Sequence, residues 1–98
     1  MKKILVVKPG LRPAPHSVAV HLWGEGCDID SDGDSERHDD PNWSELTLVL
    51  RSTLARIDVD PEPGPALALK VRSKDEHLCK KAAKFIADQS GGALVDDA

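Results

Sequence analysis

Aromatic side chains are almost missing from this sequence of 98 residues. It contains one phenylalanine, Phe85, two tryptophans, Trp23 and Trp43, and no tyrosine. Proteins that bind single-stranded nucleic acids usually present several exposed rings on which the bases stack. The shortage of rings therefore argues against a nucleic-acid-binding role, and it requires a core built from aliphatic residues.

Long apolar runs are missing too. No stretch approaches the roughly 20 apolar residues needed to cross a bilayer, and the four apolar residues at positions 4–7 are too few for the hydrophobic region of a signal peptide. With no export signal, Cys27 and Cys79 are expected to be reduced thiols of a cytoplasmic protein. Two cysteines are also too few for a disulfide-rich scaffold.

Catalytic motifs are a third absence. The chain contains no G-x-S-x-G nucleophile elbow, no phosphate-binding Walker loop and no Rossmann glycine fingerprint. Its cysteines and histidines lack the CxxC or HxxxH spacing of zinc sites. We therefore expect a protein that is not an enzyme and that holds no resident cofactor.

The apolar pattern that is present predicts a single α+β domain over residues 1–98, since a chain of this length supports one core. Apolar runs and alternation predict strands at residues 4–7, 16–23, 45–51, 55–60, 66–72 and 93–95. The prediction is a mostly antiparallel sheet of five or six strands with one C-terminal amphipathic helix packed on one face, in the order β-β-loop-β-β-β-α-β.

The predicted helix has signals at both ends. Ser73 and Glu76 have the spacing of a capping box, which places the helix start at about Lys74. Gly91 and Gly92 should end it. Between these ends the apolar residues share one arc of a helical wheel, which consists of Leu78, Cys79, Ala82, Ala83, Phe85 and Ile86.

Negative charge is concentrated between the two tryptophans. This segment has eight acidic residues against one arginine, a net charge of −7, whereas the remainder has twelve lysines and arginines against nine acidic residues, a net charge of +3. The eight are Glu25, Asp28, Asp30, Asp32, Asp34, Glu36, Asp39 and Asp40. Because the segment lacks an apolar period, we expect residues 24–42 to form an acidic surface loop.

Residues 28–39 follow the spacing D-x-D-x-D-G with an acidic residue at the twelfth place. Over these twelve residues the chain resembles an EF-hand or dockerin-type calcium loop. The resemblance implies side-chain ligands at Asp28, Asp30, Asp32 and Asp39, with the carbonyl oxygen of Asp34 as a further ligand. The last ligand is aspartate where EF-hands usually have glutamate, and no amphipathic helix precedes the segment. Calcium binding is therefore the second interpretation of this segment.

The preferred interpretation is a surface that recognises a basic protein, because clustered carboxylates attract a cationic partner over long range. The profile of a small acidic domain without a catalytic motif is shared by bacterial immunity and antitoxin proteins, so a nuclease-like toxin is the expected partner. All eight acidic residues would take part. Trp23 and Trp43 would either close the neck of the loop or provide apolar contacts to the partner. The same pattern is compatible with a purely structural domain that has a solvated insertion, and with a homodimer formed through the open sheet face.

Overall fold

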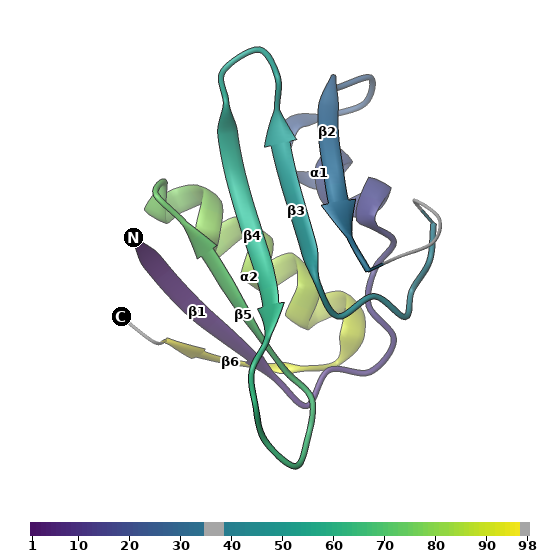
Figure 1. The fold of residues 1–98 in the computed structure, drawn as a ribbon, viewed down its shortest axis with the longest axis vertical. Helices are drawn as coiled ribbons and strands as arrows, with labels where there is room; N and C mark the ends of the chain where they lie inside the picture. The colour runs from purple at the N-terminus through teal and green to yellow at the C-terminus, as the bar shows by residue number, and fades with distance from the viewer. Residues whose placement is uncertain (35–38, 97–98) are drawn as a thin grey trace.

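The computed structural model describes residues 1–34 and 39–96, and in them six strands form one antiparallel open sheet with two helices on one face (Figure 1). The predicted α+β class is confirmed. The elements in chain order are β1 (Lys2–Val7), α1 (Pro15–Trp23), β2 (Ile29–Gly33), β3 (Leu46–Leu50), β4 (Ala55–Pro61), β5 (Ala68–Ser73), α2 (Glu76–Ser90) and β6 (Ala93–Asp96).

The strands lie side by side in the order β2-β3-β4-β5-β1-β6. β1 is antiparallel to both of its neighbours, β5 and β6, so these two strands are parallel to each other and α2 connects them. β2 and β6 are the edges of the sheet, and each therefore has one side without a neighbouring strand. Among the described residues, neither helix has the length and apolar character needed to span a bilayer.

The core lies between the sheet and the helices. Side chains alternate across a strand, so every second strand residue points toward the helices. The buried strand residues are Ile4, Val6, Leu46, Leu48, Ile57, Val59, Leu69 and Val71, and α2 adds the predicted arc, with Phe85 half-buried. The opposite face of the sheet has no covering element in the described part of the chain (Figure 1).

Residues 16–23 were predicted to be a strand, and this prediction is wrong because they lie in helix α1. Pro15 occupies the first turn, where its missing N–H costs nothing, and Gly24 follows the last turn. The buried residues Pro15, Val18, Ala19 and Leu22 have the helical spacing i, i+3, i+4 and i+7. Val18 and Leu22 fit both a helix and a strand period. The segment forms a helix because α1 packs against α2, and this packing outweighs the preference of valine for strands.

The predicted loop over residues 24–42 is interrupted by strand β2, so the predicted element order is also corrected. β2 pairs with the whole of β3, from Ile29 opposite Leu50 to Gly33 opposite Leu46. Ile29 packs against the core, while its acidic neighbours point away. A hydrophobicity pattern does not indicate this strand, because residues 28–33 contain three aspartates. Asp30 and Asp32 do alternate with uncharged residues, as in a strand.

The start of α2 differs from the predicted capping box. Asp75 is the N-cap, and its side chain accepts a hydrogen bond from the Leu78 N–H at 3.1 Å. Ser73 is buried instead, where its hydroxyl donates to the Arg56 carbonyl at 2.7 Å. Gly91 ends the helix in the left-handed conformation, as predicted.

Candidate functional site

The acidic residues predicted to bind a partner are centred on the edge strand β2. Asp30 lies opposite Val49, and Asp32 lies opposite Thr47. Residues directly opposite each other point to the same face, so both carboxylates lie on the face away from the helices. Both are exposed, and neither contacts a lysine or arginine of residues 1–34 or 39–96. We call Asp30 and Asp32 the acidic edge.

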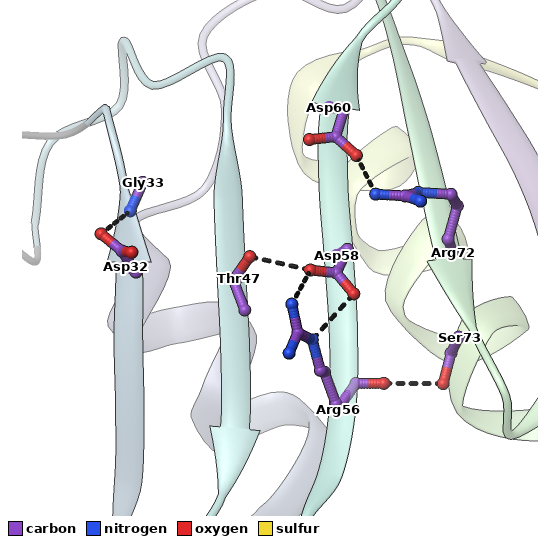
Figure 2. A network of polar contacts seen from close by, with 8 residues as sticks. All are labelled: Asp32, Gly33, Thr47, Arg56, Asp58, Asp60, Arg72 and Ser73. Atoms are coloured by element: carbon purple, nitrogen blue, oxygen red, sulfur yellow. Dashed lines mark hydrogen bonds and ion pairs between the residues drawn. The ribbon is translucent and has the colours of Figure 1, made fainter.

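Arg56 and Asp58 of β4 lie on the same face, opposite Val49 and Thr47, and they pair with each other (Figure 2). Arg56 donates to the Asp58 carboxylate from Nε at 3.0 Å and from Nη2 at 2.9 Å, and Thr47 Oγ1 donates at 2.9 Å. Partial burial favours a higher pKa for Asp58. The hydrogen bonds from Arg56 and Thr47 and the nearby charge of Arg72 outweigh it, so that the pKa lies below its ordinary value.

Two further ion pairs continue along β4 and β5. Arg72 donates to Asp60, as Figure 2 shows. Lys70 Nζ lies 2.7 Å from Glu62 Oε1. The cations in the middle of the open face are thus engaged by carboxylates beside them. Arg56, Lys70 and Arg72 therefore have carboxylates beside them on β4 and β5 and are not paired with the acidic edge.

Asp34 behaves differently, because donors at the start of β3 hold its exposed carboxylate. It accepts hydrogen bonds from the Ser44 N–H at 2.9 Å, the Ser44 hydroxyl at 2.6 Å and the Glu45 N–H at 2.9 Å. Burial acts to raise the pKa of Asp34, but these hydrogen bonds hold it below its ordinary value. Asp34 therefore ties the acidic segment to the start of β3, and we assign it a structural role.

Asp28 is intermediate between these cases. Its carboxylate lies 3.1 Å from Arg51 Nη1, and its backbone oxygen accepts from the Arg51 N–H at 3.0 Å. Both side chains are exposed, so this ion pair contributes little to stability. Breaking it to pair Asp28 with another cation would therefore cost little.

The remaining acidic residues flank the edge. Glu25 is exposed between α1 and β2, Asp39 is exposed, and Asp40 accepts from the Asn42 N–H at 2.8 Å. Glu36, also predicted as a partner contact, lies outside the described residues.

The predicted calcium loop is not formed by the residues that the structure describes. In the described residues, no three His, Cys, Asp or Glu side chains lie together so that they could hold one metal ion. Residues 29–33 are extended and paired with β3, whereas a calcium loop must curl so that alternate carboxylates converge. Gly33 has φ +152°, and a Cβ there would lie 2.2 Å from the Glu45 carbonyl oxygen. The glycine is thus required by the close approach of two backbones.

The two tryptophans have different environments. Trp43 is 1% exposed, and its Nε1–H donates to the Pro13 carbonyl at 2.8 Å. Arg12 Nε donates in turn to the Trp43 carbonyl at 2.7 Å. Trp23 is half-buried at the end of α1 and packs against the core. The prediction that Trp43 contacts a partner is therefore wrong, because its ring is buried inside the protein. Trp23 remains partly exposed.

Comparison with known proteins gives no functional information. No protein-family model matches the chain, and comparison with curated protein sequences and with solved structures finds no significant match.

Proposed function

We propose that this protein binds a basic protein partner through the acidic edge, and that its most specific role is that of a cytoplasmic immunity or antitoxin protein acting on a nuclease-like toxin. The observation that carries the proposal is the contrast across the open face. Asp30 and Asp32 have no cation within the described residues, whereas the carboxylates of β4 are paired. Unpaired exposed carboxylates are available to a partner without breaking internal ion pairs.

The geometry of β2 favours a protein as the partner. As an edge strand it has backbone N–H and C=O groups on a side without a neighbouring strand. One of these donors is already used, because the Gly33 N–H donates to Asp32 Oδ1 at 2.8 Å (Figure 2). A cationic loop could pair with the carboxylates and form backbone hydrogen bonds at the same time. A nuclease must present lysine or arginine to its phosphate substrate, and carboxylates held on a rigid sheet can occupy those positions.

The test is co-expression of this protein with the products of the genes beside its own in a bacterial host, followed by purification of the pair. We expect one product to be a basic nuclease whose toxicity and activity are suppressed. The association rate should fall more than tenfold between about 0.05 and 0.5 M salt, because screening removes the long-range attraction.

A double substitution provides the matched control. D30N/D32N removes two unpaired charges, whereas E76Q/D88N removes two charges of α2 that pair with Lys80 and Lys84. Both variants have the same net charge. The proposal requires that only D30N/D32N weakens suppression and association. Equal effects of the two variants, or a neutralised partner that is not basic, would contradict it.

A further inference from the structure

A cleft opens where β4 and β5 stop pairing. The ladder between them runs from Asp58 to Pro61 of β4, so residues 55–57 have no β5 partner. The Ser73 hydroxyl spans part of the gap by donating to the Arg56 carbonyl, as Figure 2 shows. The cavity has a volume of about 500 Å³, and its lining includes the cations Arg56, Arg72 and Lys74 and the apolar residues Met1 and Leu54. It also includes two carboxylates that already accept hydrogen bonds, Asp58 from Arg56 and Asp75 from the Leu78 N–H. We call it the β4–β5 cleft.

The cleft contains more donors than the described residues use. Arg56 bonds Asp58 through Nε and Nη2, which leaves Nη1 for a ligand. Arg72 bonds Asp60 through Nη2, while its Nε–H is buried and has no hydrogen-bond partner in the described part of the chain. Lys74 is exposed and forms no ion pair within residues 1–34 and 39–96. Unused cationic donors around a cavity favour an anionic ligand.

The lining also contains exposed apolar side chains. Leu54 is 75% exposed, and Met1 is 66% exposed. Leu54 also has a φ of +62°, a left-handed conformation that is costly for leucine and is usually taken by glycine or asparagine in such turns. Neither core packing nor turn preference accounts for a leucine at this position, whereas contact with an apolar ligand would.

We propose that the β4–β5 cleft binds a small organic carboxylate with an apolar body. The carboxylate would lie against Arg56, Arg72 and Lys74, and the apolar body against Leu54 and Met1. The cavity falls in the range of about 300 to 1,000 Å³ that is usual for small-molecule sites, and a guanidinium matches a carboxylate in geometry. The inference is independent of the acidic edge, which lies on another strand and has the opposite charge.

The experiment is a titration of the ¹⁵N-labelled protein followed by NMR, with 4-phenylbutyrate as the probe. At about 10 mM probe, above the millimolar Kd typical of a ligand of this size, we expect amide shifts concentrated at Leu54, Ala55, Ser73 and Lys74. Two control compounds each lack one feature of the probe. The neutral amide of 4-phenylbutyrate has no negative charge, and inorganic phosphate has no apolar body. Each should bind at least about tenfold more weakly, as expected for the loss of one charge-assisted or apolar contact.

Variants then separate the carboxylate site from general attraction. R56Q should weaken phenylbutyrate binding about tenfold through loss of a charged donor. R51Q is the matched control, because Arg51 is equally exposed and lies near the same end of the sheet but outside the cleft. L54N removes one of the exposed apolar side chains of the cleft and suits the left-handed turn, so it should weaken binding without unfolding the protein. Shifts that are absent, that are equal for acid and amide, or that respond equally to R56Q and R51Q would overturn the proposal.

Discussion

At the scale of single residues, similar carboxylates have different roles because their hydrogen-bond donors differ. Asp34 is satisfied by three donors around the start of β3. Asp58 is held between Arg56 and Thr47. Asp30 has no cation in the described residues and is exposed. The sequence could locate these acids, but only the positions of their donors separate structural carboxylates from those available to a partner.

Asp34→Ala should lower the free energy of unfolding at neutral pH by about 1 kcal/mol, since its hydrogen bonds resemble those of a helix cap at an exposed site. The folded pKa of Asp34 lies below its ordinary value of 3.8. Its contribution is therefore complete above that value and is lost as the pH falls through the lower folded pKa.

Urea unfolding of wild type and Asp34→Ala as a function of pH checks this prediction. The difference between the two proteins should be constant near neutrality and shrink in acid. A difference that grows in acid would show that Asp34 does not act as an anionic acceptor.

Trp43→Ala should destabilise the protein by about 3 to 5 kcal/mol, because the ring is fully buried. Trp43→Phe should cost less, about 1 to 3 kcal/mol, mainly through the unpaired Pro13 carbonyl. Denaturant unfolding measures both. A Trp43→Phe variant that is fully stable but fails to bind the partner would restore Trp43 as a partner contact.

At the scale of elements, the sequence predicted those helices and strands whose apolar residues fit only one period, either that of a helix or that of a strand. β3 and α2 have clear periods and were predicted nearly to their ends. α1 failed because Val18 and Leu22 satisfy both a strand and a helix period. β2 failed because its pairing with β3 is a tertiary interaction that its acidic residues do not indicate. Likewise, the β4–β5 cleft depends on where two strands part, which no local pattern encodes.

The N-cap of α2 offers a prediction at this scale. Asp75→Ala should cost about 1 kcal/mol by leaving the Leu78 N–H without its acceptor. Thermal unfolding measures this, with Asp88→Asn on the last turns of the same helix as the control for loss of charge. Equal small effects of the two substitutions would show that Asp75 is not the functional cap.

A further prediction at this scale concerns the contact between β2 and β3. Gly33→Ala should destabilise the protein and selectively loosen β2, because the added Cβ meets the Glu45 carbonyl and φ is unfavourable. Hydrogen exchange should show faster exchange of the β2–β3 amides with β4 and β5 unchanged. Calcium should not restore the protection. Restoration by calcium would favour the metal loop over the strand.

At the scale of the whole molecule, the protein separates its charges across one open sheet. The helices cover one face, the paired ions of β4 and β5 occupy the middle of the other, and the acidic edge lies at its margin (Figures 1 and 2). In the role that we propose, attraction of a cationic partner would depend on this arrangement more than on the net charge of −4.

The most direct test is to map where a cationic chain contacts the protein, by NMR titration with an oligoarginine peptide at low salt. Amide shifts should centre on residues 29–33, fade at high salt, and disappear in D30N/D32N while persisting in E76Q/D88N. Shifts spread over the surface, or centred on α2 and lost equally in both variants, would contradict the claim that the acidic edge is the recognition site.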